Sequence, residues 1–315
     1  MNQLTKLLNI QYPIIQGGMG NISNAPLTAA ISEAGGLGTI GVGTMHPDEV
    51  EKIIIETKRL TSRPFAVNIP ISVTPFLKEN LALVLKYDVP IVSLSAGNPA
   101  PFIQKLHEEN RKVIAVVASV KHAQKAEDAG VDIVAAEGYE AAGINSPLET
   151  TTLTLIPQIV DAVKIPVVAA GGIGDGRGLA SMLLLGASGI QMGTRFIATQ
   201  EAPFHSLYKE KIVTSNDTST VIIGRSVGKI RRLLQTPYAS KLLDYEHKGM
   251  TEEEYLQLTS EEFHKRGALD GNEQEGFMNA GQIAGLITSV PTVKQLLDEM
   301  MDDAKNQLKK TLEFF

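Results

Sequence analysis

Eight short apolar segments alternate with amphipathic segments along the first two-thirds of the chain. The apolar segments are rich in Val, Ile and Ala and cover residues 13–16, 37–42, 65–69, 91–95, 113–117, 133–136, 165–170 and 190–196. The amphipathic segments between them cover residues 25–34, 47–60, 77–87, 101–110, 120–129, 153–163 and 178–185. Segments of these lengths predict strands and helices that follow one another in strict alternation.

This alternation predicts the fold class. Strands separated by helices form a parallel sheet, and eight repeats favour closure into an α/β barrel of the (β/α)8 (TIM) type. An open, doubly wound sheet is the alternative architecture. In a barrel, the functional residues lie at the carboxyl ends of the strands.

The last third of the chain departs from the alternation. Residues 200–275 are more charged and less periodic, and this length is too great for an ordinary connection. We therefore expect a barrel over residues 1–199, a helical lid or subdomain over residues 200–275, and closing helices over residues 276–315. Arg231 and Arg232 are expected on a solvated helix face, with binding of a phosphate group as the alternative.

Charge and composition exclude several functions. The formal net charge of the 315-residue chain is −6 and it contains no cysteine, which excludes disulfides and thiolate metal sites. No basic patch indicates nucleic acid as a partner, and no apolar run reaches the roughly 20 residues that span a membrane. We expect a cytoplasmic protein without a metal site.

Glycines gather where two predicted strands end. The segment from residue 171 reads GGIGDG, and the last strand runs into GTR from residue 193. Glycines between a strand and a helix let backbone amides approach an anion closely, at the positive end of the helix dipole. These loops predict a phosphate site, in the position where TIM barrels commonly have one. The alternative is that the glycines only allow tight turns.

The other predicted strand ends are glycine-rich and carry uncharged polar groups. They read QGGM from residue 16, GVG from residue 41, GNP from residue 97 and QMGT from residue 191. Such a rim suits a flat aromatic ring better than a metal ion, which prefers clustered His or carboxylate ligands.

Eight motifs in order identify a family resemblance. The motifs PIIQGGMG, SEAGGLGTIG, FAVNI, SAGNP, AEGYEAAG, VVAAGGIGDGRG, IQMGTRF and MNAGQIAGL together resemble the FMN-dependent nitronate monooxygenases (2-nitropropane dioxygenases) and the related type II enoyl-acyl carrier protein reductases. The resemblance covers nearly the whole chain and implies an oxidoreductase built on an FMN-binding TIM barrel.

The resemblance also implies the cofactor-binding residues. It places FMN against residues at the strand ends and against a segment that closes over the ring: Gln16, Gly17, Gly18, Met19, Asn68, Glu137, Ala142, Gly172, Gln191, Met192, Gly193, Thr194, Met278 and Gln282. Gly171, from the glycine loop analysed above, joins this set as part of the predicted phosphate site.

One position departs from the family pattern. The family usually has a histidine after strand 6 as its acid or base, and this chain has Ile144 there. Isoleucine cannot move a proton, so the catalytic residue is unknown, and Asn145 and Ser146 are the nearest polar candidates. An alkyl nitronate is already ionised and needs no base. We therefore rank oxidation of alkyl nitronates with O2 first.

Two alternatives stay open. The first is an NAD(P)H-dependent reductase acting on enoyl-acyl carrier protein or on a quinone. The second is a ligand-binding barrel that has lost turnover. In each case the partner is a small molecule, with acyl carrier protein as a further partner of the reductase, and the resemblance implies a homodimer.

Overall fold

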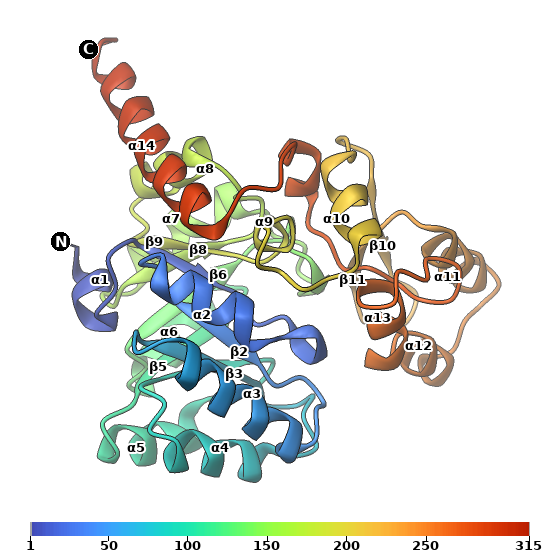
Figure 1. Cartoon of the computed structure of the whole chain (residues 1–315), viewed down its shortest axis with the longest axis horizontal. Helices are drawn as coiled ribbons and strands as arrows, with labels where there is room; N and C mark the ends of the chain where they lie inside the picture. Colours follow the sequence, from blue (N-terminus) through green and yellow to red (C-terminus); the bar gives the residue numbers. More distant parts are fainter. Residues whose placement is uncertain (1, 315) are drawn as a thin grey trace.

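Eight parallel strands form a nearly closed barrel at the centre of the computed structural model, which describes residues 2–314 (Figure 1). The barrel strands are β1 (Ile14–Gln16), β2 (Gly38–Gly41), β3 (Phe65–Pro70), β4 (Ile91–Ser95), β5 (Lys112–Val117), β6 (Ile133–Glu137), β8 (Val167–Ala170) and β9 (Gly189–Met192). Their order in the sheet is β1-β9-β8-β6-β5-β4-β3-β2. The TIM-barrel prediction is therefore confirmed, and the open sheet is excluded.

The seam between β1 and β2 is closed by single backbone contacts. Ile15 and Leu37 form an isolated parallel bridge. The Gln16 amide donates to the Leu37 carbonyl over 2.9 Å, and the Leu37 amide donates to the Ile14 carbonyl over 2.9 Å. The first strand is thus held between the last strand and the second.

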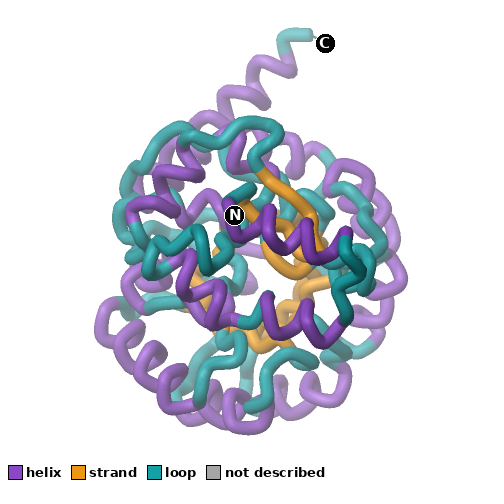
Figure 2. Tube along the Cα trace, turned by 90° about the vertical axis from the view of Figure 1, so that its right-hand side faces the viewer, coloured by secondary structure: helices purple, strands orange, loops and turns teal. Residues whose placement is uncertain are grey.

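Helices surround the strands, as Figure 2 shows. The barrel helices are α1 (Gln3–Leu8), α2 (Ala25–Glu33), α3 (Pro47–Leu60), α4 (Leu77–Lys86), α5 (Ala100–Glu108), α6 (Val120–Asp128), α7 (Thr152–Ala162), α8 (Gly176–Leu184), α9 (Thr194–Ile197) and α14 (Val293–Leu312), with short 3-10 turns η1 (Gly20–Ile22) and η2 (Gln282–Leu286). In α3, Asp48 and Glu49 occupy the first turn, while Val50 and Ile54 are buried against the sheet. Carboxylates favour the positive helix start, and the apolar spacing selects the buried face.

Two apolar layers hold the barrel together. The larger lies between the sheet and the outer helices, and the smaller fills the barrel interior with side chains such as Ile15, Ala66 and Ile133. Leu4 and Leu8 of α1 belong to the interior layer and are almost completely buried. Helix α1 therefore packs against the barrel interior and leaves the opposite, carboxyl end of the strands for a site.

The last predicted strand is too long. Strand β9 ends at Met192, and residues 194–197 form the helix α9. Thr194, Phe196 and Ile197 are all buried. An apolar run that is buried on all sides does not distinguish strand from helix by its periodicity.

The subdomain, residues 200–275, contains strands as well as the expected helices. Its elements are α10 (Ser206–Val213), β10 (Thr220–Ile223), β11 (Arg231–Leu234), α11 (Pro237–His247), α12 (Glu252–Leu258) and α13 (Glu261–Ala268). Strand β11 pairs antiparallel with β10 and with the short β7 (Gly143–Ile144), which follows barrel strand β6. The purely helical description of this segment is therefore corrected, and the placement of Arg231 and Arg232 on a solvated helix is wrong.

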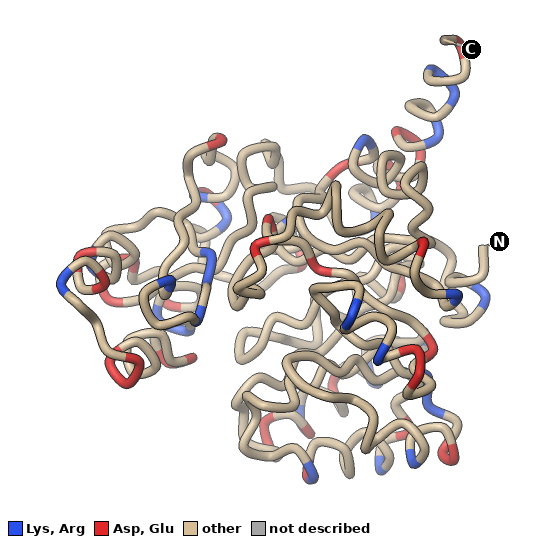
Figure 3. The backbone as a smooth tube through the Cα atoms, turned by 180° about the vertical axis from the view of Figure 1, so that it is seen from behind, with Lys and Arg blue, Asp and Glu red and all other residues tan. Residues whose placement is uncertain are grey.

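The subdomain has its own apolar core, which includes Leu233, Tyr238, Leu242 and Phe277. Figure 1 shows it beside the barrel, linked through α10 and β11. Lys and Arg are interspersed with Asp and Glu on both parts (Figure 3). Within residues 2–314, every helix is too short or too polar to cross a membrane.

Candidate active site

A cavity of about 830 Å³ lies at the carboxyl ends of the barrel strands. This volume is in the range of pockets that hold small molecules and cofactors. The barrel supplies backbone and mostly small side chains from the ends of β1, β3, β4, β5, β6, β8 and β9, together with the larger side chains His122, Lys125, Glu137 and Glu140. The subdomain supplies Tyr208, Arg231, Glu261 and His264. The cavity therefore has a barrel wall and a subdomain wall.

Most of the predicted cofactor-binding residues lie on the barrel wall. They are Gly17, Gly18, Met19, Asn68, Glu137, Ala142, Gly171, Gly172, Gln191, Met192, Gly193 and Thr194. Three do not line the cavity. Gln16 is buried beneath it, where its Oε1 accepts from the Thr39 amide over 2.9 Å. Met278 is fully buried in the core, and the Gln282 side chain is exposed, so their neighbours Asn279, Gly281 and Ile283 line the cavity instead.

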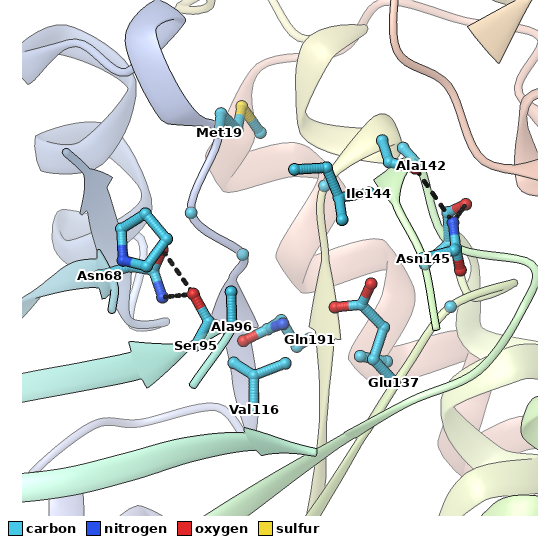
Figure 4. Close-up of a pocket in the computed structure, with 18 of the residues that line it drawn as sticks. Met19, Asn68, Ser95, Ala96, Val116, Glu137, Ala142, Ile144, Asn145 and Gln191 are labelled. Carbon is cyan, nitrogen blue, oxygen red and sulfur yellow. Dashed lines mark hydrogen bonds between the residues drawn. The ribbon is translucent and has the colours of Figure 1, made fainter. Parts of the chain in front are cut away.

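The loop after β1 packs tightly against Asn68. A Cβ atom on Gly18 would come within 2.5 Å of the Asn68 Oδ1. The Asn68 amide donates to Ser93 Oγ over 3.0 Å and to Ser95 Oγ over 3.2 Å, and Figure 4 shows the contact with Ser95. This network fixes a carboxamide at the edge of the cavity, where it can contact a polar ring.

The loop after β8 has the conformation of an anion cradle. Gly171 and Gly172 have φ angles of +97° and +73°, which side chains rarely adopt. Both line the cavity together with Gly193 and Thr194 from the neighbouring strand end. Gly174 and Gly176 do not line the cavity, because Gly174 packs against Ile283 and Gly176 packs against Asp303 and Ala304 of α14. Of the residues in the predicted phosphate site, Gly171, Gly172, Gly193 and Thr194 line the cavity.

Glu137 is the carboxylate at the end of β6. Burial raises its pKa from 4.5 to about 7. Figure 4 shows its carboxylate and the side chain of Ile144 pointing toward the same space. Burial therefore keeps this carboxyl group protonated to a higher pH than an exposed glutamate, and in its protonated form it can donate as well as accept a hydrogen bond.

Asn145 and Ser146, the two polar candidates for a catalytic role beside Ile144, form hydrogen bonds with backbone groups. The Asn145 amide donates to the carbonyls of Ala141 over 2.9 Å and Gly143 over 3.2 Å. Ser146 Oγ accepts from the Leu148 amide over 3.3 Å. Both residues line the cavity, but these contacts give each of them a structural role in the turn after β7.

The subdomain wall carries the charged side chains that sequence reasoning missed. Glu261 and His264 lie one turn apart on α13, with 3.4 Å between Glu261 Oε2 and His264 Nδ1. Contacts with His264, the charge of Arg231 and the Asn21 amide lower the pKa of Glu261 to about 2, against the opposing effect of burial. The i, i+3 spacing of these residues on an amphipathic helix is the sequence signal that was available.

His264 is held on three sides. Its ring stacks on Phe277 with 5.2 Å between centroids and 2° between planes. Its Nε2 lies 3.1 Å from the Asn279 Nδ2. The side chain is only 2% exposed, so the imidazole is fixed in one orientation at the cavity wall.

A (β/α)8 barrel with a cavity at its carboxyl-terminal rim has the architecture of a barrel enzyme. A family model described as nitronate monooxygenase matches residues 1–79 and 71–303. The chain belongs to the nitronate monooxygenase family, and it is an oxidoreductase.

Individual relatives agree with this assignment. A probable nitronate monooxygenase of Staphylococcus haemolyticus is 35% identical, over 98% of this chain and 98% of the relative. The solved structure of FabK from Thermotoga maritima is 40% identical with a TM-score of 0.93, covering 100% of this chain and 99% of that one. The nitroalkane oxidase of Streptomyces ansochromogenes is 25% identical with a TM-score of 0.87, covering 98% of this chain and 99% of that one.

Proposed function

We propose that this protein is an FMN-dependent enzyme that oxidises alkyl nitronates, with O2 as the electron acceptor. The observation that carries the proposal is Ile144, which lines the cavity and exposes 55% of its surface. A neutral nitroalkane must lose a proton from carbon, and an isoleucine at this place cannot take it. A nitronate arrives without that proton, so an apolar side chain here is compatible with turnover.

The barrel wall fits FMN. The tips of the loops after β8 and β9, with Gly171, Gly172, Gly193 and Thr194, would hold the phosphate through backbone amides. Gly18 and Asn68 both line the cavity and would lie against the ring. Bound FMN supplies the redox step by taking electrons from the substrate and passing them on.

The chain itself contributes binding, orientation and exclusion of water. The Asn68 carboxamide is fixed by two serine hydroxyls, so it presents one polar edge to the cavity. Glu137, with its raised pKa, carries a carboxyl proton through part of the neutral range. The subdomain wall lines the cavity with Arg231, Glu261 and His264, and Asn279 from the segment that follows the subdomain lies beside them.

A half-reaction experiment tests the proposal. The purified protein is expected to show the visible spectrum of a flavin, and anaerobic mixing with propionate 3-nitronate is expected to bleach it, with recovery when O2 is admitted. NADH serves as the comparison donor. A flavin that NADH bleaches and the nitronate leaves unchanged would contradict the proposal.

One alternative has its own support. The 40% identity to FabK over the whole chain favours a reductase that takes electrons from NAD(P)H and passes them to an enoyl-acyl carrier protein. That reaction must also deliver a proton to the substrate, which Ile144 cannot do. Bleaching by NADH followed by recovery with crotonyl-acyl carrier protein under anaerobic conditions would establish this alternative.

A further inference from the structure

Two consecutive arginines on β11 lie in different surroundings. Arg231 pairs with Ile144 and Arg232 pairs with Gly143 in the antiparallel register with β7. Directly opposed residues project to the same face of a sheet, and consecutive residues project to opposite faces. Arg231 therefore shares a face with Ile144, and both line the cavity.

Arg232 has a complete set of local partners. It donates through Nη2 to the Tyr139 carbonyl over 3.0 Å and through Nη1 to Thr220 Oγ1 over 3.2 Å. Its guanidinium also lies 4.7 Å from the centre of the Tyr139 ring. These contacts within the protein satisfy the buried guanidinium of Arg232, so no ligand is needed to explain its burial.

Arg231 has far fewer partners. It is 6% exposed, and its buried Nε has no hydrogen-bond partner. Its guanidinium packs 4.9 Å from the centre of the Phe277 ring and interacts with the Tyr255 side chain. Among the ion pairs within residues 2–314, none includes Arg231. A buried cation is costly unless it is paired, so this position favours a ligand that brings negative charge.

The carboxylates around the cavity do not neutralise Arg231, because each of them is bound to another group or is partly protonated. Glu261 feels the charge of Arg231 but is hydrogen-bonded to His264. Glu140 is turned toward α7, where it accepts from the amide and hydroxyl of Thr152 over 2.9 and 2.8 Å. Glu137 is partly protonated at neutral pH because burial raises its pKa. An anion next to Arg231 therefore meets little uncompensated negative charge.

We propose that Arg231 is the specificity-determining residue that binds the anionic group of a small organic substrate, such as a nitronate or carboxylate, while Ile144 contacts its alkyl chain. This inference rests on the proposed function for its substrate class. The guanidinium offers charge-assisted hydrogen bonds to two oxygen atoms of a planar anion. The neighbouring apolar side chain selects an alkyl substituent over a second charged group.

The test compares Arg231→Gln with Arg232→Gln as a matched control on the same strand. Calorimetry measures binding of butanoate and of butanamide, which are similar in size but differ in charge, to the flavin-loaded protein. Wild type and Arg232→Gln are expected to prefer butanoate, and Arg231→Gln is expected to bind it roughly 10- to 100-fold more weakly with butanamide unchanged. The KM for propyl 1-nitronate is expected to rise in the same variant by a similar factor.

Several outcomes would overturn the inference. Equal binding of butanoate and butanamide by the wild type does so without any variant, and so does an equal loss for both probes in Arg231→Gln. If Arg231→Gln does not fold, Arg231→Lys keeps the charge, and it must retain part of the preference for butanoate. Charge-selective binding that depends on Arg231, without nitronate oxidation, would refute the proposed function and leave this site standing.

Discussion

The two walls of the cavity are built from different chemistry. The barrel wall consists mainly of glycines, backbone amides and carboxamides at the ends of parallel strands, with Glu137, Glu140, His122 and Lys125 as its titratable side chains, while the subdomain wall brings Arg231, Glu261 and His264. Backbone groups held by a rigid sheet suit a cofactor that is the same in every turnover. Charged side chains on a separate unit suit a substrate that differs between relatives. This difference supports the proposed arrangement, in which the barrel wall holds the cofactor and the subdomain wall binds the substrate.

The strongest test of the barrel wall is Gly172→Glu, which puts a carboxylate into the proposed phosphate cradle. It is expected to weaken FMN binding by at least about 100-fold, because the carboxylate repels the phosphate and displaces its amide contacts. Flavin content after dialysis and a titration with FMN measure the effect. Gly172→Ala is the control, because it imposes the same strain at a φ of +73° without the charge. Similar losses in the two variants would assign the effect to the backbone.

The charge state of the barrel wall is tested by Glu137→Gln. Burial raises the pKa of Glu137 from 4.5 to about 7, so the folded state binds this proton more tightly than the unfolded state does. Stability then falls as the pH rises from 4.5 to 7, and the whole cost is present above pH 7. The variant is expected to be more stable than wild type at pH 8, by up to about 3 kcal/mol, with little difference near pH 4.5.

Urea unfolding at the two pH values measures this difference. Asp161→Asn, on an exposed position of α7, is the control and is expected to show no such pH dependence. A Glu137→Gln variant that is equally stabilised at both pH values would contradict a titration of this carboxyl group.

Ile144 lies where the two walls meet, on β7, which pairs with β11 of the subdomain. The variant Ile144→His tests whether the lack of a proton acceptor at this position restricts the enzyme to nitronates. A histidine on β7 would add an imidazole at the position of Ile144, separate from the one that His264 already presents, and it can take a proton from a neutral nitroalkane there. Oxidation of nitroethane is expected to become at least about 10-fold faster relative to oxidation of its nitronate. Ile144→Gln is the control, because it is polar but does not exchange a proton near neutral pH. A gain of the same size with glutamine would show that polarity alone matters.

Thr251→Ala, the variant with the smallest expected effect, tests whether the subdomain unfolds independently of the barrel. Thr251 forms a capping box with Glu254 at the start of α12, so its loss is expected to cost about 1 kcal/mol. Hydrogen exchange is expected to accelerate in α12 and its neighbours while the barrel strands stay protected. Thr151→Ala, at the start of α7 where no side-chain cap is made, is the control. Acceleration throughout the barrel would show that the two parts unfold together.

The barrel was predictable because its pattern is local and repeated. Helix α3 begins and ends where the sequence predicts, since Pro47, first-turn carboxylates and apolar spacing all indicate the same element. The last strand was predicted too long, because the buried run continues from β9 into α9 without a change in composition. In such a run, tertiary contacts determine which residues form a strand and which form a helix.

The subdomain wall was harder to predict. Strand β11 is completed by β7, which lies almost 90 residues earlier in the chain, and no local pattern reveals that pairing. Two adjacent arginines are typical of a solvated face, yet both are buried here by Tyr139, Phe277 and the β7 strand. His264 becomes a cavity residue only because α13 packs against η1. Site residues that depend on contacts between distant segments are beyond what periodicity can show.

The seam beside β1 has a consequence for synthesis of the protein. Strand β1 is made long before the neighbour that pairs with it along its length, β9, which begins at Gly189. At ordinary translation speeds this interval is on the order of 10 s, during which the edge of the nascent first strand has no permanent neighbour. The growing polypeptide is therefore expected to depend on chaperones, or on shielding by the ribosome, until the last barrel strand, β9, emerges.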